Sequence, residues 1–313
     1  MKGVVFCFLV LSISVTAQKE MVVAKDGSGD YTSVQDALDA IPVGNEKERI
    51  IRIKNGVYKE RLVLDSLKNY VTLIGQDKDR TILTYDNHTG RILPNGDTVN
   101  TWTSASFFLL ANHFKARNIT FENNAGFTAG QAVAVFAKGD QLSFINCRFV
   151  GFQDVLFCSG AGSRHYYKNC YIEGTTDFIF GSSTAVFQDC VIHSKKNSHI
   201  TAASTPQESK YGFVFIHCKL TADSAVNKVT LGRPWRPYAS VAYIKCTMGN
   251  HIIPEGWDNW RNVANEKTAR YSEYKSAGTH PASRVKWSRQ LTDKEAAKYS
   301  LKTIFGDWNP EQE

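Results

Sequence analysis

Short segments with alternating apolar and polar residues recur along most of the chain. Five of them share a pattern in which an aromatic residue stands three positions before a cysteine and an apolar residue stands two positions after it. These segments are residues 144–149, 167–172, 187–192, 215–220 and 243–248, and a weaker copy at 117–121 precedes them. Alternation with a period of two is typical of β-strands, so each copy predicts a strand.

The spacing of the copies predicts how these strands are arranged. Equivalent positions recur after 28, 23, 20, 28 and 28 residues, which is typical of proteins built from stacked repeats. One copy is too short to bury its own apolar face, so the copies must stack, as in a parallel β-helix. The sequence therefore predicts an all-β solenoid with an inward column of small, buried cysteines. A disulfide between stacked cysteines stays open.

The flanking segments predict less regular coils and covers for the ends of the solenoid. Residues 49–53 and 70–73 have the composition of strands. A capping-box pattern from Thr32 to Gln35 precedes an amphipathic segment, which predicts a helix over the N-terminal end. A similar pattern from Thr292 to Glu295 predicts a second helix near the C-terminus. Because no linker or low-complexity break is present, residues 18–313 are interpreted as one domain.

The first 17 residues have the pattern of a secretory signal peptide. Lys2 precedes an apolar run over residues 4–13, and small residues follow at Val15 and Ala17. The run is too short to span a membrane, which takes about 20 residues, and no later apolar run is longer. We therefore expect cleavage after Ala17 and export to the periplasm or the medium, without a membrane anchor.

Composition and motifs narrow the class of function. The chain has 42% hydrophobic and 21% charged residues, which is a globular composition, and a net charge of +7. This charge is compatible with a polyanionic partner and equally with an ordinary solvated surface. The sequence contains no Gly-x-Ser-x-Gly elbow, no His-Glu-x-x-His pattern and no phosphate-binding loop. A serine hydrolase, a zinc enzyme and a nucleotide-binding enzyme are therefore disfavoured.

Two aspartates occupy equivalent places in neighbouring repeats. Asp154 and Asp177 each follow the cysteine of their repeat by seven positions, and a glycine precedes each of them by three. If the strands stack at about 4.8 Å, the two carboxyl groups lie on adjacent rungs. Two neighbouring carboxylates cannot both ionise at low cost, so their pKa values should separate. The alternative is a polar turn in which each aspartate caps local backbone groups.

The residues around this pair resemble those of the pectin methylesterase (pectinesterase) family. The motifs that carry the resemblance are GFQDVL at 151–156, GTTDFIFG at 174–181 and LGRPW at 231–235, with Gln131 one coil before Gln153. Weaker matches lie at 26–30, 56–60 and 254–257, so the resemblance covers nearly the whole mature chain. It implies a right-handed parallel β-helix that hydrolyses the methyl esters of galacturonate in pectin without a metal or an organic cofactor.

The resemblance also implies roles for individual residues. Asp177 would be the nucleophile, Asp154 the general acid and then base, and Arg233 the partner that holds Asp177. Gln131 and Gln153 would donate hydrogen bonds to the oxyanion. Phe180 and Trp235 would line the sugar subsites. We expect Thr101, Phe157 and Trp257 to bind substrate as well, although the aromatic residues could instead serve in packing. These residue types suit the chemistry, because a guanidinium favours an ionised carboxylate nucleophile and leaves the second carboxyl as a proton donor.

Two other functions on the same fold stay open. A polysaccharide lyase would be expected to need clustered acids for Ca²⁺, whereas here only two aspartates are placed together. A solenoid that binds acidic polysaccharide without turning it over would keep the groove and the charge but would not need the Asp154, Asp177, Gln131 and Gln153 set. We expect a monomer that acts on methyl-esterified homogalacturonan and binds neither nucleic acid nor membrane.

Overall fold

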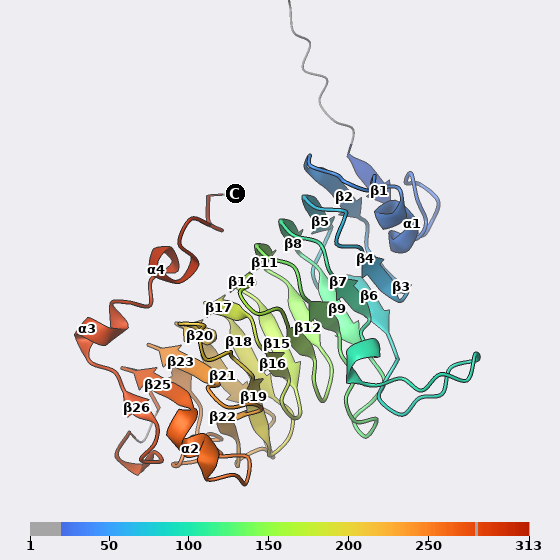
Figure 1. Cartoon of the computed structure of the whole chain (residues 1–313). Coiled ribbons are helices and arrows are strands. Elements are labelled where there is room, and N and C mark those ends of the chain that lie inside the picture. Colours follow the sequence, from blue (N-terminus) through green and yellow to red (C-terminus); the bar gives the residue numbers. More distant parts are fainter. Residues whose placement is uncertain (1–19, 279–280, 313) are drawn as a thin grey trace, which may run out of the picture.

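The computed structural model describes residues 20–278 and 281–312, and it is a parallel β-helix. The chain winds through three long parallel sheets, and each of the central coils adds one strand to each sheet (Figure 1). The all-β solenoid predicted from the repeats is therefore confirmed. Residues 1–17, the predicted signal peptide, lie outside the described residues. In the part of the chain that the structure covers, no helix is both long and apolar enough to cross a bilayer.

The three sheets are named by their number of strands. The 11-stranded sheet contains β1 (Met21–Val23), β2 (Arg49–Ile53), β5 (Val71–Gly75), β8 (Phe114–Arg117), β11 (Leu142–Ile145), β14 (Arg164–Lys168), β17 (Thr184–Gln188), β20 (Phe213–Ile216), β23 (Ser240–Ile244), β25 (Arg270–Tyr274) and β26 (Arg289–Gln290). The eight-stranded sheet contains β3 (Gly56–Lys59), β6 (Thr81–Tyr85), β9 (Thr120–Asn123), β12 (Arg148–Val150), β15 (Tyr171–Gly174), β18 (Val191–Ser194), β21 (Lys219–Ala222) and β24 (Thr247–Met248). The seven-stranded sheet contains β4 (Leu62–Leu64), β7 (Phe107–Leu109), β10 (Val135–Ala137), β13 (Leu156–Cys158), β16 (Ile179–Gly181), β19 (His199–Ala203) and β22 (Thr230–Pro234).

The sharp bend between the 11-stranded and eight-stranded sheets explains the repeat around each cysteine. The residue just before the cysteine position has a positive φ of 51–56° in six successive coils, at Asn118, Asn146, Asn169, Asp189, His217 and Lys245. Asparagine and aspartate tolerate this left-handed backbone better than most residues do. The cysteine then points inward, and its thiol satisfies a carbonyl of the preceding coil. Cys190 Sγ, for example, lies 3.4 Å from Tyr167 O.

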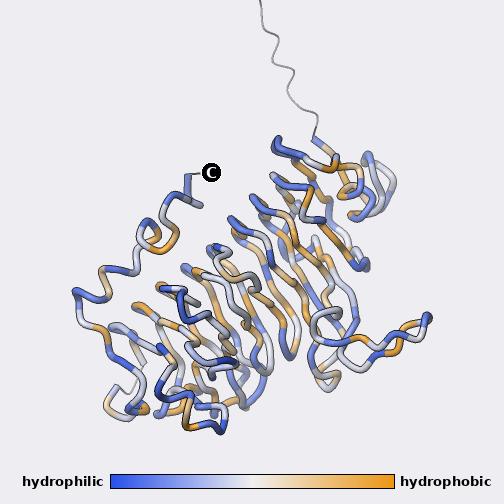
Figure 2. The backbone as a smooth tube through the Cα atoms, in the orientation of Figure 1, coloured by the Kyte–Doolittle hydropathy of each residue, from blue (hydrophilic) through white to orange (hydrophobic). Residues whose placement is uncertain are grey.

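The inward column of cysteines is confirmed, and it runs beside a column of stacked rings. All six cysteines of the described residues are buried and free, so the disulfide left open above does not form. The aromatic residue of each repeat stacks on that of the next coil, with ring centroids 4.4–5.0 Å apart, through Phe144, Tyr167, Phe187, Phe215 and Tyr243. Such pairs contribute about 0.5–1.5 kcal/mol each beyond area burial. Hydrophobic stretches accordingly recur from coil to coil (Figure 2).

The N-terminal end is covered by α1 (Val34–Asp39), as predicted, although its cap lies one residue later than expected. Ser33 is the N-cap, and its side chain accepts a hydrogen bond from the backbone of Asp36 at 3.2 Å. The distant Glu60 carboxylate accepts from the first helical amides, at 3.1 Å from Val34 N and 2.9 Å from Gln35 N. A carboxylate from another coil thus takes the place of the predicted Thr32–Gln35 capping box.

The C-terminal segment, residues 291–312, differs from the expected end cap in its position. It contains the predicted capping box at the start of α3 (Asp293–Ala296), followed by α4 (Leu301–Phe305). Both helices then fold back along the outer face of the 11-stranded sheet (Figure 1). Arg164 of β14 donates to Phe305 O at 2.9 Å, five strands before the end of that sheet.

The C-terminal end of the solenoid is instead closed by rings and by a buried ion pair. Trp257 stacks on Tyr271 with ring centroids 4.3 Å apart. The Arg284 guanidinium donates to both carboxylate oxygens of Glu273, at 2.7 and 3.1 Å. The described residues also contain the short α-helix α2 (Ala264–Thr268) and two 3₁₀ helices, η1 (Thr101–Thr103) and η2 (Pro281–Ser283). Residues of η1 line a cleft together with residues of the seven-stranded sheet.

Candidate active site

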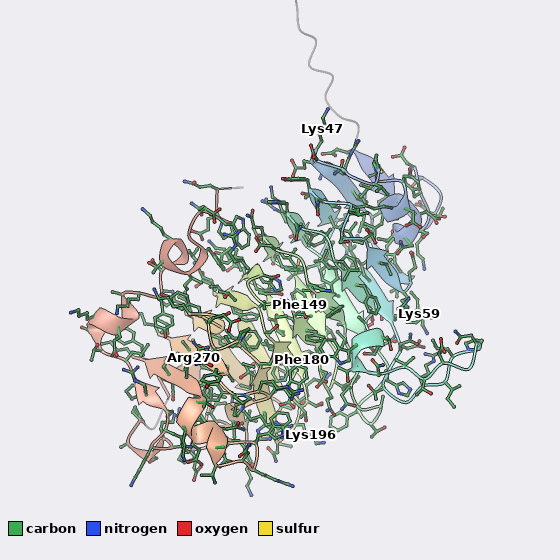
Figure 3. The ribbon with its side chains drawn as sticks, in the orientation of Figure 1. Lys47, Lys59, Phe149, Phe180, Lys196 and Arg270 are labelled. Atoms are coloured by element: carbon green, nitrogen blue, oxygen red, sulfur yellow. The ribbon has the colours of Figure 1, made fainter. Side chains whose placement is uncertain are left out.

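A cleft of about 260 Å³ lies on the outer face of the seven-stranded sheet, near the middle of the solenoid, where Phe180 is labelled in Figure 3. It is lined by Thr101, Trp102, Gln131, Gln153, Asp154, Asp177, Phe180, Ala202, Arg233, Trp235 and Trp260. Most of the residues singled out from the sequence therefore meet in one place, although they span more than a hundred positions of the chain.

The two aspartates lie on adjacent rungs at the entrance to two paired strands. Strands β13 and β16 pair with Leu156 opposite Ile179, so the equal offset places Asp154 beside Asp177. Both residues have a positive φ, 63° and 49°, and both are buried, with 8% and 5% of their surface exposed. Their backbone amides donate to carbonyls of the next coil at 3.1 and 2.8 Å. The backbone therefore holds both carboxyl groups in fixed places at the cleft.

Arg233 distinguishes one aspartate from the other. Its Nε and Nη2 donate to the two carboxylate oxygens of Asp177, at 3.0 and 2.7 Å. The guanidinium also lies 3.7 Å from the centre of the Trp260 ring. A two-point pair of this kind fixes both charge and direction, which a lysine could not do. Asp177 is thus held as a carboxylate, whereas Asp154 has no such direct partner among the described residues.

The surroundings raise the pKa of both aspartates, but for Asp154 more strongly. Burial raises the pKa of Asp154 well above its ordinary value, the neighbouring Asp177 carboxylate raises it further, and Arg233 opposes these effects. Burial also raises the pKa of Asp177, but there the hydrogen bonds and charge of Arg233 counteract the effect most strongly. The pKa values of the two aspartates therefore separate in the expected direction, and Asp154 stays protonated to a higher pH than Asp177.

Two glutamines lie beside the carboxyl groups. Gln131 and Gln153 form an isolated parallel bridge between neighbouring coils, and Ala132 N donates to Gln153 O at 3.0 Å. Both side chains line the cleft. Neutral amides in such a place can donate hydrogen bonds to an oxygen that becomes negative during a reaction. In the described ranges, no group of three His, Cys, Asp or Glu side chains is placed to hold a metal ion.

Comparison with known proteins places this constellation in a family. The model of the Pectinesterase family matches residues 20–307. The chain belongs to the pectinesterase family. It is 41% identical to Pectinesterase 31 of Arabidopsis thaliana over 285 residues, which cover 88% of this chain and 89% of that protein. Among solved structures, pectin methylesterase from carrot is 32% identical with a TM-score of 0.85, covering 93% of this chain and 94% of that one.

A second solved relative carries a ligand. This pectin methylesterase in complex with a hexasaccharide is 30% identical to the chain, with a TM-score of 0.84, and the match covers 94% of this pectinesterase and 99% of that chain. Because the matches extend over nearly all of both chains, the whole solenoid, and not one motif, is shared with the family.

The structure divides the predicted substrate-binding residues of this pectinesterase into three groups. Thr101, Phe180 and Trp235 line the cleft. Phe157 lies beneath its floor, 1% exposed, with its ring 4.2 Å from that of Phe180, so it supports the floor without facing the cleft. Trp257 was a wrong prediction. It is 3% exposed and belongs to the core at the C-terminal end, where the chain needs a large ring to close the last coil.

Two large cleft residues are missing from the sequence-based prediction. Trp102 is 53% exposed, and its ring lies 6.2 Å from that of Trp235. Trp260 stacks on Arg233 and stands only three positions after Trp257. Both stand in irregular segments, where strand periodicity carries no information about direction. A capping box formed by Asn100 and Thr103 fixes η1, and Trp102 lies within this element. This capping pattern is the local sequence feature that could have indicated a fixed position for Trp102.

Proposed function

We propose that this pectinesterase hydrolyses the C6 methyl esters of galacturonate units in pectin and releases methanol. The observation that carries the proposal is the two-point Arg233–Asp177 pair beside a second buried carboxyl, Asp154. An ionised and a protonated carboxyl side by side provide a nucleophile and an acid in one cleft. Family membership and the hexasaccharide complex of a relative support a polysaccharide substrate.

The first half of the reaction forms an acyl-enzyme. The Asp177 carboxylate attacks the ester carbonyl carbon and gives a tetrahedral oxyanion, which accepts hydrogen bonds from the side-chain amides of Gln131 and Gln153. Asp154 then donates its proton to the departing methoxide as the C–O bond breaks, and methanol leaves. The products of this half are an anhydride between Asp177 and the sugar, and an ionised Asp154.

The second half restores the enzyme. Asp154, now a carboxylate, takes a proton from water as the water oxygen attacks the anhydride. The bond to Asp177 breaks, which leaves Asp177 ionised and releases the galacturonic acid unit, whose carboxyl group then loses the second proton of the water to the solvent. Arg233 pairs with Asp177 again, so the nucleophile and the acid return to their starting protonation states.

The rim of the cleft suits a chain of sugars. Phe180, Trp235, Trp102 and Trp260 offer apolar ring faces for sugar rings, and Thr101 offers a hydroxyl. We also propose that residues 1–17 direct export, that residues 18–313 act as one domain, and that the mature protein works as a monomer outside the cytoplasm. The match of the family from residue 20 onward supports this division of the chain.

The test is methanol release from highly methylated pectin. Asp177→Asn and Asp154→Asn should each lower kcat/KM by at least about 10³-fold, because each removes a positioned group that reacts. The matched control is Asp189→Asn. Asp189 has the same left-handed backbone, with φ of 55°, at a bend outside the cleft, and this variant should retain full activity.

The same variants separate the enzyme from the alternatives. A binding-only solenoid would release no methanol in any form, including the wild type. Retained turnover in both aspartate variants would refute the assigned roles. Unsaturated products and a requirement for Ca²⁺ would indicate the lyase instead.

A further inference from the structure

The loop at residues 151–154, which carries Gln153 and Asp154, connects β12 to β13. Three of its residues are bonded to the backbone of neighbouring coils: Thr175 N donates to Phe152 O at 2.8 Å, Ala132 N donates to Gln153 O at 3.0 Å, and Asp154 N donates to Thr176 O at 3.1 Å. In the described ranges, no backbone amide donates to the carbonyl of the fourth residue, Gly151. A backbone carbonyl away from water needs another donor.

This missing bond comes from a shift of one residue in the hydrogen-bond register. In the next coil, the residue four positions after the cysteine is Gly174, and the residue five positions after the following cysteine donates to it. That donor is Lys195 N, at 2.8 Å from Gly174 O. The equivalent donor in the active-site coil is Thr175 N, but it bonds to Phe152 O in place of Gly151 O.

The side chain of Lys195 supplies the missing donor from two coils further along the chain. Its Nζ lies 3.4 Å from Gly151 O and 4.3 Å from the centre of the Phe152 ring. The same Nζ donates to Glu173 Oε1 at 2.9 Å. One ammonium group therefore contacts both the backbone and an aromatic ring of the loop, while a carboxylate holds the ammonium in place.

The pair of Lys195 and Glu173 is largely shielded from solvent. Their side chains are 21% and 15% exposed. Tyr171 OH donates to the other carboxylate oxygen of Glu173 at 2.8 Å, so both oxygens are bonded. The next residue, Lys196, labelled in Figure 3, differs because it is exposed and its Nζ lies over the ring of Phe127, at 5.9 Å from the ring centre. Two adjacent lysines thus have different surroundings, and Lys195 is the one that holds the loop.

We propose that Lys195, fixed by Glu173, is a positioning residue that holds the 151–154 loop and keeps Gln153 and Asp154 directed into the cleft. Lys195 does not line the cleft, so it acts through the loop and not on the substrate. The inference rests on the proposed function and adds a residue to it. Gln153 and Asp154 act on charge that develops during the reaction, so a loose loop should slow turnover more than it weakens substrate binding.

The experiment measures methanol release from methylated pectin by wild type and by variants of this pair. Lys195→Met keeps the length of the side chain but removes the donor and the charge, and it should lower kcat by about 10- to 100-fold while KM changes by less than about twofold. Lys195→Arg should restore most of the turnover, because a guanidinium also donates to a carbonyl and a carboxylate. The double variant with Glu173→Gln leaves no unpaired carboxylate, so it should fold even where the single variant does not, and it should show the same loss.

The dependence of kcat on pH gives a second readout, which a simple loss of stability would not move. Burial is the largest cause of the raised pKa of Asp154, and the charges of Asp177 and Arg233 act on it from other coils. A looser loop admits water, so the alkaline limb of kcat should move to lower pH in Lys195→Met. Amide hydrogen exchange of Asp154 and Thr175 should also be faster in this variant, and it needs no turnover.

Two controls separate positioning from general effects of charge and stability. Lys196→Met removes an equal charge at the next position. Lys68→Met removes a lysine whose side chain is 13% exposed and which also donates to backbone carbonyls, Leu38 O and Asp39 O, both at 3.0 Å, beside the N-terminal helix. Lys68→Met should lower stability, but both controls should keep the kcat and the pH profile of wild type.

The outcomes separate this inference from the proposed function. If Lys195→Met and the double variant keep the wild-type kcat and pH profile, or if Lys68→Met loses kcat equally, the role of Lys195 is overturned and the esterase stands. A higher KM at unchanged kcat would also overturn it, because Lys195 would then act on substrate binding. If wild type releases no methanol, the proposed function fails, and unchanged hydrogen exchange in Lys195→Met would show separately that the lysine does not hold the loop.

Discussion

At the scale of single residues, the cleft contains a side chain, Asp154, that lowers the stability of the folded protein. Asp154 has a left-handed backbone. Its side chain is buried next to the Asp177 carboxylate, and both burial and that neighbouring charge are unfavourable for an ionised side chain. Asparagine tolerates the same backbone and carries no charge. The chain therefore holds a carboxyl where a neutral side chain of the same shape would be more stable, which is typical of a site selected for reaction.

Asp154→Asn should therefore stabilise the protein while it abolishes activity. The folded-state pKa of Asp154 is well above the unfolded value near 3.8, so ionisation favours the unfolded chain as the pH rises past that value. At pH 7 the variant should gain at least about 1 kcal/mol, the equivalent of one pKa unit. Near pH 3.5 most of the gain should be lost, because Asp154 is then protonated in the folded state and mostly protonated in the unfolded state. Thermal melts at the two pH values measure this, and a gain that does not depend on pH would contradict it.

The dependence of activity on pH follows from the same pair. Turnover needs an ionised Asp177 and a protonated Asp154. Because the pKa of Asp177 is raised, activity should already fall on the acid side at a pH above 3.8, and it should fall again on the alkaline side as Asp154 loses its proton. Initial rates of methanol release between about pH 4 and 9 should give a bell shape that belongs to the coupled pair. A flat profile over this range would contradict the acid–base assignment.

Residue-level prediction from the sequence succeeded where strand register determines position. Asp154 and Asp177 stand at equal offsets from regular strands, so repeat arithmetic brings them together. Arg233 was expected beside Asp177 only because the family resemblance implies it, and the pairing of its strand with β19 places it there. Prediction failed for Trp257 and missed Trp260, because both lie in an irregular segment after the last regular coils. In that segment Trp257 packs into the core at the C-terminal end, whereas Trp260 faces the cleft. No periodic sequence pattern indicates which of the two points inward.

At the scale of elements, the column of stacked aromatic rings ends at the last coil, where a charged residue occupies the position of the next ring. Strand pairing places Glu273 of β25 directly after Tyr243 in the inward column of stacked rings. Its side chain is 2% exposed, and Arg284 reaches it with a side chain that is 3% exposed. The pair ends the column with a group that cannot stack further, while Arg284 also donates to Pro254 O at 2.9 Å and holds the closing loop.

Arg284→Met should destabilise the protein by about 3–5 kcal/mol, because it leaves the Glu273 carboxylate buried without a partner. Replacing both residues, with Glu273→Leu and Arg284→Met, should recover most of this loss, since an apolar pair can fill the same space. Urea unfolding measures both. Arg289→Met serves as a control, because its ion pair with Glu295 is exposed and should matter little. Equal losses in the single and double variants would show that volume, and not charge, decides.

The sequence predicted the type of these helices and strands correctly, but it did not predict the contacts that cap and position the helices. The strand predicted at 49–53 coincides with β2. The N-terminal helix forms where expected, but the carboxylate that completes its cap comes from Glu60 in another coil, which local sequence patterns cannot record. The single helix predicted near the C-terminus is present as two short helices, α3 and α4. They dock on a sheet face formed by residues far away in the chain, and local sequence patterns cannot indicate that site.

At the scale of the whole molecule, the sheets divide the work. The seven-stranded sheet carries the cleft. The outer face of the 11-stranded sheet carries an apolar cluster, which the C-terminal segment covers with Ile304, Phe305 and Trp308. Ion pairs tie the same segment down, since Arg164 pairs with Asp307 and Lys168 with Glu311. The face that carries the active-site cleft and the face covered by the C-terminal segment therefore lie on different sides of the core.

This separation predicts that the C-terminal segment can be weakened without changing the chemistry. Phe305 is 2% exposed and packs against Tyr166, so Phe305→Ala should cost about 3–5 kcal/mol of stability by leaving a cavity. Truncation after Gln290 should go further and expose the apolar face, which should make the protein aggregate on mild heating. In both cases kcat and KM of the folded fraction should stay within about twofold of wild type, because the cleft contacts neither Phe305 nor its cluster. Thermal melts with methanol release at a permissive temperature test this, with exposed Lys302→Ala as the control. A fall in kcat at unchanged stability would show that the two faces of the solenoid are coupled.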